Sequence, residues 1–371
     1  MVTAAEHALL KRPGYPAARF NLALAHALNG DAGASLRVLE SLLASGIDFN
    51  VAELEEFAEV RSLAGWPAYE QGIRALRQPV GNATVAEQRD DDRFVPEVIA
   101  IDADGRILLG SIRRGTIVRG DEVLSRRQGH WSVFGMRFHN DGSLWFASAA
   151  VPQLADVGAD QGKTGLFRLD MESGKITRAA LLPQRADEQV LGDLVLAGDT
   201  IYTTDSLTGA LYRYDIAADE FTALLEPGTF GSPQGLVLDE SGKHLYVADY
   251  IGGLHRVAVE DGKVERLVLQ GPASDYGIDG LYRYHDRLIA IQNGIQPHRV
   301  TAFRLSPEGT SIVEARVLAA NLPGFDEPTL GAIRDDAFYF VANSHWNRFD
   351  RDNALPDGLS GPIVLKVSLA E

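Results

Sequence analysis

A pair of short strands recurs along most of this chain, and no other sequence feature restricts the possible folds as strongly. In each copy a turn joins two apolar strands, as residues 96–101 precede 106–111 and residues 233–238 precede 244–249. A third strand follows, such as residues 211–214. The six copies are spaced about 37 to 58 residues apart, which is the range of propeller blades. The pattern therefore predicts a mainly β fold, a six-bladed β-propeller.

The last copy runs out before a fourth strand can follow residues 363–368. An unpaired sheet edge at that point would be costly, and propellers close their ring by taking a strand from the other end of the domain. Residues 82–90 lie directly before the first copy and have a suitable length. We expect them to supply the closing strand of blade six.

The first eighty residues carry a different pattern, in which apolar residues recur at helical spacing and Gly or Pro interrupts them. Residues 17–28 form one expected helix, and Asp31 can cap the next. This helical hairpin resembles a tetratricopeptide unit, in which small residues let two helices pack closely. We therefore divide the chain into a helical, tetratricopeptide-like domain, residues 1–80, and a propeller, residues 81–371.

The helical domain is too short to be a solenoid by itself, because stacked repeats stabilise one another. One interpretation is that it packs against the propeller or against a sister subunit in a homo-oligomer. The other is that it forms a groove for a peptide of a protein partner.

Composition excludes several classes of partner. The chain has 35 Lys and Arg against 51 Asp and Glu, a formal net charge of -16, and such a surface repels nucleic acid and anionic membranes. It has no Cys, so it has neither disulfides nor a thiolate nucleophile. No apolar run approaches the roughly 20 residues that cross a bilayer, so we expect no membrane insertion. The lack of Cys and the start of the chain close to a helix favour a periplasmic over a cytoplasmic location.

The innermost strands of the blades should bring one set of side chains to the channel. These strands begin at one face of the propeller, so equivalent positions at their starts converge on the axis. Three of these positions carry side-chain oxygens, namely Glu97, Gln234 and Asp279. Two carboxylates and an amide suit a hard divalent cation that keeps several waters. The alternative is that they only hydrogen-bond the water of the channel.

A second polar set follows the second strands, on the same face of the propeller. Its members are Ser111, Ser148, Asp205, Asp249, Asn293 and Asn343. They either contact a substrate, with Asp205 and Asp249 as the strongest candidates, or cap turns. The long loop 344–361 should also rise over the mouth, and loops of that length are often functional. Its His345 and Arg348 either bind an anionic or hydroxylated substrate or pack the loop.

The repeat and three of its motifs resemble the senescence marker protein/gluconolactonase family, also called regucalcin-like, over about residues 84–371. The motifs are Pro96-Glu97, Pro233-Gln234-Gly235-Leu236 and Asp279-Gly280-Leu281. The resemblance implies a divalent metal, most often calcium, at the channel mouth and hydrolysis of sugar lactones or related esters. By position Glu97 and Asp279 match two family ligands, and Gln234 stands where Asn is usual. Gly192 occupies the place of the remaining Asn, so that ligand is absent unless Asp193 replaces it.

The leading hypothesis is therefore a metal-dependent hydrolase of a small lactone or ester. The cation bound by Glu97, Gln234 and Asp279 would polarise the carbonyl, and Asp279 or Asp205 would take a proton from water. Asp249, Asn293, Asn343, His345 and Arg348 are the candidate substrate contacts. Two alternatives stay open. One is a non-catalytic propeller that binds a ligand or partner, and the other is a metal-free enzyme of the strictosidine-synthase type.

Overall fold

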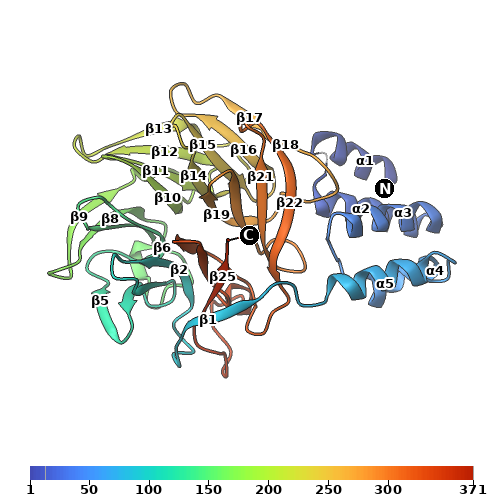
Figure 1. Cartoon of the computed structure of the whole chain (residues 1–371), viewed down its shortest axis with the longest axis horizontal. Helices are drawn as coiled ribbons and strands as arrows, with labels where there is room; N and C mark the ends of the chain where they lie inside the picture. The colour runs from blue at the N-terminus through green and yellow to red at the C-terminus, as the bar shows by residue number, and fades with distance from the viewer. Residues whose placement is uncertain (13, 371) are drawn as a thin grey trace.

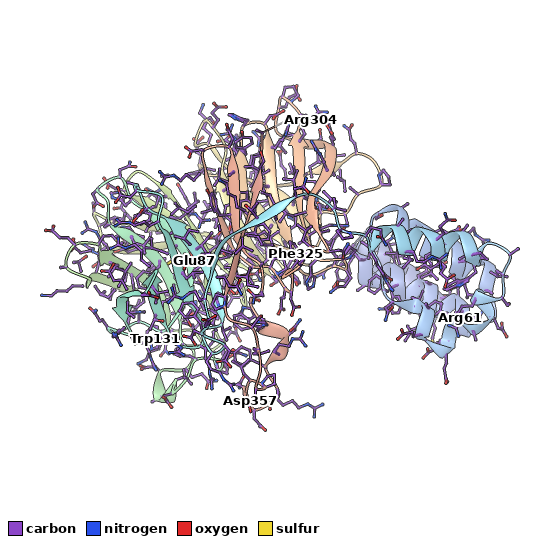
Figure 2. The ribbon with its side chains drawn as sticks, turned by 60° about the horizontal axis from the view of Figure 1, so that its bottom comes forward. Arg61, Glu87, Trp131, Arg304, Phe325 and Asp357 are labelled. Carbon is purple, nitrogen blue, oxygen red and sulfur yellow. The ribbon has the colours of Figure 1, made fainter. Side chains whose placement is uncertain are left out.

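The computed structural model describes residues 1–12 and 14–370, and it has a helical part beside a ring of β-sheets (Figure 1). The ring consists of six sheets, so the predicted six-bladed β-propeller with a small N-terminal helical part is confirmed. Figure 2 shows the helical part, which carries Arg61, at one side of the propeller, which carries Trp131 and Arg304. None of the described helices is long and apolar enough to cross a membrane.

The helical part contains five α-helices and two short 3-10 helices in its described residues. They are α1 (Val2–Lys11), α2 (Pro16–Leu28), α3 (Ala32–Ala44), η1 (Val51–Glu53), η2 (Glu55–Phe57), α4 (Ala58–Arg61) and α5 (Trp66–Leu76). Asp31 caps α3 as expected, because its Oδ1 accepts the backbone N–H of Ala34 at 2.9 Å. Leu39, Leu42 and Phe57 are buried in a core shared by these helices. Burial of that apolar face holds the short helices together.

Blades one to three are antiparallel sheets of four strands each, in chain order. Their strands are β2 (Pro96–Ile101), β3 (Ile107–Ser111), β4 (Thr116–Arg119), β5 (Glu122–Arg126), β6 (Ser132–Phe138), β7 (Leu144–Ala149), β8 (Thr164–Asp170), β9 (Lys175–Leu181), β10 (Leu191–Ala197), β11 (Thr200–Asp205), β12 (Ala210–Asp215) and β13 (Glu220–Leu225). The helix η3 (Gly158–Asp160) lies in the loop between β7 and β8. The buried residues of neighbouring blades pack into shared clusters, which stabilise the ring.

Blade four is also a four-stranded antiparallel sheet in chain order, whereas blades five and six differ at their outer edges. Their strands are β14 (Pro233–Leu238), β15 (His244–Asp249), β16 (Gly253–Ala258), β17 (Val264–Arg266), β18 (Val268–Leu269), β19 (Ile278–Tyr284), β20 (Arg287–Gln292), β21 (Arg299–Leu305), β22 (Ser311–Ala320), β23 (Gly331–Arg334), β24 (Ala337–Val341) and β25 (Ile363–Ser368). The helix η4 (Trp346–Arg348) lies in the long loop before β25. The short β18 adds to blade five in parallel with β22.

The sixth blade takes its outermost strand from the N-terminal side of the propeller. The strand β1 (Ala83–Gln88) pairs antiparallel with β25, and Val85 lies opposite Leu365. In Figure 1, β1 runs from the end of α5 to β25. The expected closing segment, residues 82–90, therefore contains the strand that pairs at this edge.

The helical part packs against blade five of the same chain. The buried side chain of Ile295, in the loop between β20 and β21, belongs to the helical core. The backbone N–H of Asp48 donates to the carbonyl of Gln296 at 2.9 Å, and Arg299 Nη1 donates to the carbonyl of Gly46 at 2.6 Å. The structure thus shows one of the contacts that we considered for the helices, namely packing against the propeller.

The first strands of blades one to five share an irregularity near the channel mouth. The ladder to the second strand shifts register after its first pair in blades one, three, four and five, and after its second pair in blade two. In blade one, Glu97 has no partner in the ladder. In blade three the unpaired residues are Gly192 and Asp193, and in blade five they are Asp279 and Gly280. A bulge of this kind re-aims a side chain and is frequent beside active sites. It turns the candidate ligands away from the ladder and towards the channel.

Candidate functional site at the channel mouth

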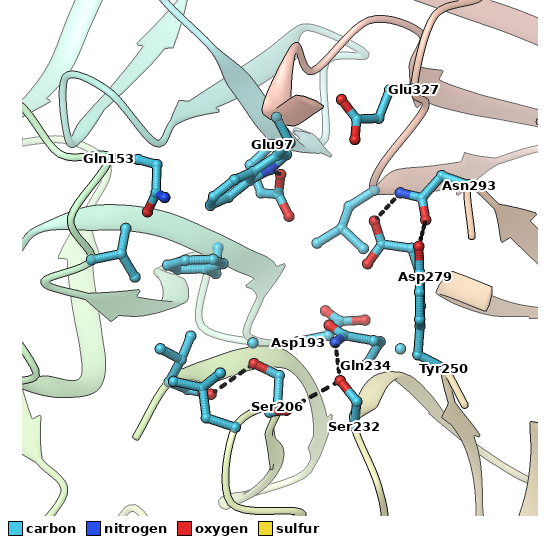
Figure 3. Close-up of a pocket in the computed structure, with 18 of the residues that line it drawn as sticks. Glu97, Gln153, Asp193, Ser206, Ser232, Gln234, Tyr250, Asp279, Asn293 and Glu327 are labelled. Carbon is cyan, nitrogen blue, oxygen red and sulfur yellow. Dashed lines mark hydrogen bonds between the residues drawn. The ribbon is translucent and has the colours of Figure 1, made fainter. Parts of the chain in front are cut away.

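A cavity of about 500 Å³ opens where these bulges meet. Figure 3 shows Glu97, Asp193, Gln234, Asp279, Asn293 and Glu327 around it. Apolar side chains complete the wall, among them Phe134, Leu330 and Trp346. The volume is typical of sites for small organic ligands, and a few polar groups in an apolar wall fix the orientation of such ligands. The three expected metal ligands, Glu97, Gln234 and Asp279, thus line one cavity.

Glu97 lies in the wall below the long loop before β25. It is buried, and its Oε2 accepts a hydrogen bond of 2.6 Å from the indole N–H of Trp346. Burial and the nearby charge of Asp279 raise the pKa of Glu97 well above its ordinary value. Its Oε1 accepts no hydrogen bond from the described residues, and this oxygen is free for a ligand.

Asp279 faces Glu97 from blade five. Its Oδ2 accepts a hydrogen bond of 2.7 Å from the side-chain amide of Asn293, which also donates to the carbonyl of Pro328 at 2.9 Å. Burial raises the pKa of Asp279 to about 7, and the charges of Asp193 and Glu327 act in the same direction. The hydrogen bond from Asn293 opposes them. A carboxylate with a pKa near 7 is suited to accept and release a proton at neutral pH.

An ion pair closes the channel beneath these two carboxylates. Arg137 Nη2 lies 3.0 Å from Oδ2 of Asp193, and the guanidinium of Arg137 stacks over the ring of Tyr282 at 5.4 Å. Asp193 lines the mouth, whereas Arg137 and Tyr282 line a cavity at the other end of the channel. Asp193 does come to the site beside Gly192, but its charge is paired with Arg137. It therefore contributes less free negative charge to the mouth than Glu97 or Asp279.

The residues present can accommodate a divalent cation in part. Glu97 Oε1, Asp279 Oδ1 and Gln234 Oε1 face one cavity and accept no hydrogen bond from the described residues, while Gln234 Nε2 donates to Ser232 Oγ at 3.0 Å. Hard oxygen donors of this type suit calcium or magnesium. Within residues 1–12 and 14–370, no three His, Asp or Glu side chains cluster closely enough to hold a metal by themselves. The amide of Gln234 and water would have to complete the ligand sphere.

Asp205 and Asp249 lie outside this site. Asp205 Oδ1 accepts the N–H groups of Val190, Leu207 and Thr208, and its Oδ2 accepts the Thr208 hydroxyl. Asp249 accepts the N–H groups of Gly231 and Ser232. Both are buried, and neither lines the cavity. The turn-capping interpretation thus describes them, and we withdraw Asp205 as a proton acceptor and Asp249 as a substrate contact.

For the long loop before β25, the loop-packing alternative describes His345 and Arg348. Asn343 is buried and binds Ser360, Gly361 and Ile363, and His345 Nε2 lies 2.9 Å from the Ser360 carbonyl. Arg348 is exposed and pairs with Asp326 at 3.0 Å. None of these three expected contacts lines the cavity, because they hold the loop in place. The residue that this loop sends into the site is Trp346.

Asn293 reaches the site because of its register. Asp205, Asp249 and Gln292 end their strands opposite the first residue of the preceding strand, so Gln292 is the blade-five equivalent of the two turn caps. Asn293 comes one residue later and points to Asp279 instead. The polar set read from the sequence therefore combined residues at two different strand positions. Only the strand pairing in the structure distinguishes these positions.

The structure adds Glu327 and Tyr250, which no sequence pattern had assigned, and it selects Trp346 from the residues at the start of the long loop. Glu327 lines the cavity, as do Trp346 and Tyr250, and Tyr250 donates its hydroxyl to Asn293 Oδ1 at 3.0 Å. Trp346 stood within the loop already singled out, and its aromatic character was a usable signal. No sequence pattern marks Glu327, since it lies outside the repeat positions.

Comparisons with known proteins support the fold. No known family model matches the sequence, and no curated protein matches it. Similar solved structures include the major allergen of Malassezia sympodialis, at 13% identity and a TM-score of 0.56, covering 78% of this chain and 95% of that chain. Another is the PQQ-bound aldose sugar dehydrogenase from Streptomyces coelicolor, at 14% identity and a TM-score of 0.54. This match covers 78% of this chain and 98% of that chain. A third is an inactive virginiamycin B lyase from Staphylococcus aureus with quinupristin, at 13% identity and a TM-score of 0.51, covering 78% and 99%. The TM-scores and the coverage establish a shared propeller fold. Two of the three similar structures are enzymes.

Proposed function

We propose that this protein is an enzyme that hydrolyses a small lactone or related ester at the channel mouth, with a divalent cation, calcium first, as its cofactor. The observation that carries the proposal is the pairing of Glu97 with Asp279 in a cavity of about 500 Å³, where the pKa of Asp279 is raised to about 7. Perturbed carboxylates in a concave site are typical of catalytic centres. The similar propellers named above include a dehydrogenase and a lyase, which is consistent with an enzyme.

Asp279 is the proton acceptor in this mechanism. Its Oδ2 accepts the Asn293 amide, so Oδ1 faces the cavity, and the two lone pairs of Oδ1 would let it hold the cation with one and take a proton from an attacking water with the other. Asn293 is in turn fixed by Pro328 and Tyr250, and it holds the carboxylate in one orientation. The proton taken up by this carboxylate then passes to the leaving oxygen.

Glu97, Gln234 and Asp279 are the residues that would hold the cation. When bound there, a divalent cation supplies Lewis acidity towards a carbonyl oxygen. Trp346 fixes the Glu97 carboxylate through its indole N–H, and Ser232 fixes the amide of Gln234. Phe134 and Leu330 exclude water from the wall between these groups.

A second candidate is a metal-free acid–base enzyme. Burial and the charge of Asp279 raise the pKa of Glu97 well above its ordinary value, and burial raises the pKa of Asp279 to about 7, so a protonated carboxyl can stand beside a carboxylate here. Such a pair can donate from one carboxyl and accept at the other. A purely ligand-binding propeller is the third possibility, and it predicts saturable binding without turnover.

Calcium titration by calorimetry, combined with turnover of a panel of lactones and aryl esters, separates these candidates. Asp279→Asn keeps the shape and an oxygen but loses basicity, so turnover should fall by about 10² to 10⁴. Gln234→Asn restores the ligand type that the family resemblance implies, and it should keep or tighten calcium binding. Full activity of Asp279→Asn would contradict the mechanism, and turnover that is independent of chelator would favour the metal-free pair. Circular dichroism checks that both variants fold.

A further inference from the structure

A second cavity, of about 730 Å³, lies between the helical part and blade five. It is lined from the helical side by Asp48, Phe49 and Asn50 and from the propeller side by Ile295 and Pro297, among others. Tyr250 and Asn293 line both this cavity and the channel mouth. These two side chains, which Figure 3 shows at one edge of the mouth, are hydrogen-bonded to each other at 3.0 Å. The two cavities therefore share a wall, and that wall includes the residue that orients Asp279.

The walls of this inter-domain cavity are held in place by buried contacts. Ile295 is only 6% exposed and lies in the helical core. Arg299 is 4% exposed, and its guanidinium donates to the carbonyl of Gly46 and to Gln292 Oε1. Burial lowers the pKa of Arg299 to about 10, and none of its hydrogen bonds goes to a carboxylate. Such a contact is lost only at considerable cost, so the cavity is pre-formed.

The chemistry of the inter-domain cavity differs from that of the mouth. Its charged lining residues are Asp48 and Arg77, which neutralise each other, with Arg77 Nε 2.7 Å from Asp48 Oδ2. Arg77 Nη2 also donates to Asn50 Oδ1 at 2.8 Å. Arg77 Nη1, Asn50 Nδ2 and Asn321 Oδ1 make no hydrogen bond with the described residues, so two donors and one acceptor are available to a ligand.

Apolar groups lie beside these polar atoms. Ile47, Phe49, Ile295 and Pro297 line the same cavity, and Phe49 stacks on Phe20 at 4.6 Å, which fixes its ring. An ion of either sign would meet its like charge in the Asp48–Arg77 pair. An uncharged group with hydroxyls on a carbon frame matches both kinds of wall.

We propose that the inter-domain cavity is a subsite for the distal part of an extended substrate, and that this part is an uncharged, hydroxyl-bearing group such as a glycosyl unit. The inference rests on the proposed function, because the reacting group would occupy the channel mouth on the other side of Tyr250 and Asn293. The helical part thereby acts as a specificity element that the propeller alone does not possess.

The test compares two lactones with the same reacting ring, glucono-δ-lactone and its 4-O-glucosyl derivative. We expect wild-type kcat/KM to be at least about tenfold higher for the glucosylated lactone. Arg77→Met removes the donor but keeps much of the side-chain volume. It should lower the ratio of kcat/KM for the glucosylated lactone to kcat/KM for the plain lactone by about tenfold, which is the effect of one hydrogen bond from a charged donor. Asn50→Gly removes the amide and tolerates the left-handed backbone at φ 54°, so it should lower the ratio even if Arg77→Met fails to fold.

Arg74→Met is the matched control, because Arg74 lies on α5, pairs with Glu70 at 3.0 Å and does not line the cavity. It should keep the wild-type ratio. Equal kcat/KM for both lactones in wild type, or an unchanged ratio in both cavity variants, would overturn the subsite. If neither lactone is hydrolysed, the proposed function fails for lactones, and binding of maltose measured by calorimetry decides the subsite. Binding that Arg77→Met weakens about tenfold supports it, and absent or unaffected binding overturns it.

Discussion

The side-chain amide of Asn293 donates a hydrogen bond of 2.7 Å to Asp279 Oδ2 and accepts the hydroxyl of Tyr250 at 3.0 Å on its oxygen. Asn293 begins the loop whose Ile295 is buried in the helical core. The helical part therefore holds the segment that orients the candidate proton acceptor. Its contribution to the channel mouth is indirect, because it acts through one asparagine.

Any turnover that persists without a metal, as the metal-free candidate predicts, should depend on pH through Asp279. Its pKa is raised to about 7, and the base is competent only when ionised. Below pH 7, kcat/KM should therefore fall about tenfold for each pH unit, and above pH 7 it should be level. We call this fall of kcat/KM the acidic limb of the pH–rate profile. A cation held by Asp279 favours the ionised form, so calcium should move this limb to lower pH. A pH–rate profile with calcium and with chelator checks both statements, and a limb that calcium leaves in place would argue against Asp279 as a ligand.

Asn293→Ala should move the same limb in the opposite direction. The substitution removes a hydrogen bond that stabilises the ionised carboxylate, so the pKa of Asp279 should rise further and the limb should shift to higher pH. The matched control is Asn140→Ala, since Asn140 is exposed in the turn between β6 and β7. A loss of activity with an unshifted limb would mean that Asn293 has only a structural role.

The ion pair at the channel floor should matter for stability. Asp193→Asn leaves the half-buried Arg137 guanidinium without its buried carboxylate partner, so the free energy of unfolding should fall by about 1.5–3 kcal/mol. Urea denaturation measures this change. The double variant Arg137→Met/Asp193→Leu removes both charges, and it should be less destabilised than Asp193→Asn. A double variant that loses as much as the sum of the losses in Arg137→Met and Asp193→Leu would show that the two side chains act independently.

The closure of blade six can be tested at one glycine. A Cβ on Gly361 would lie 1.9 Å from the carbonyl oxygen of Arg89, directly after β1, so Gly361→Ala should push the closing strand away. We expect a loss of about 1–3 kcal/mol in the free energy of unfolding, as for other overpacked sites. Gly33→Ala in α3 places its Cβ in ordinary contact, 3.5 Å from Arg37, and should stabilise the protein by about 0.5–1 kcal/mol. Thermal denaturation of both variants gives the comparison, and equal effects would contradict the closure.

Much of the architecture followed from local patterns. Strands, turns and the repeat are encoded by alternation and turn residues over short stretches, so the six blades were predictable, and so was the cap of α3 by Asp31. The three channel positions Glu97, Gln234 and Asp279 followed from the repeat, since equivalent positions in a closed ring must converge. Local spacing and ring symmetry carry that information without any knowledge of packing.

The tertiary structure decided which polar residues serve the site. Asp205 and Asn293 looked alike in sequence, yet one caps a turn and the other reaches Asp279, because a strand end that differs by one residue points its side chain elsewhere. Glu327 and the pairing of Asp193 with Arg137 also depend on contacts between residues distant in sequence. Short-range patterns in the sequence are enough to encode the repeat, the blades and the convergence of their first strands. Only the folded chain decided register, charge pairing and the packing of the helical part on blade five, since these arise from long-range contacts that no local pattern encodes.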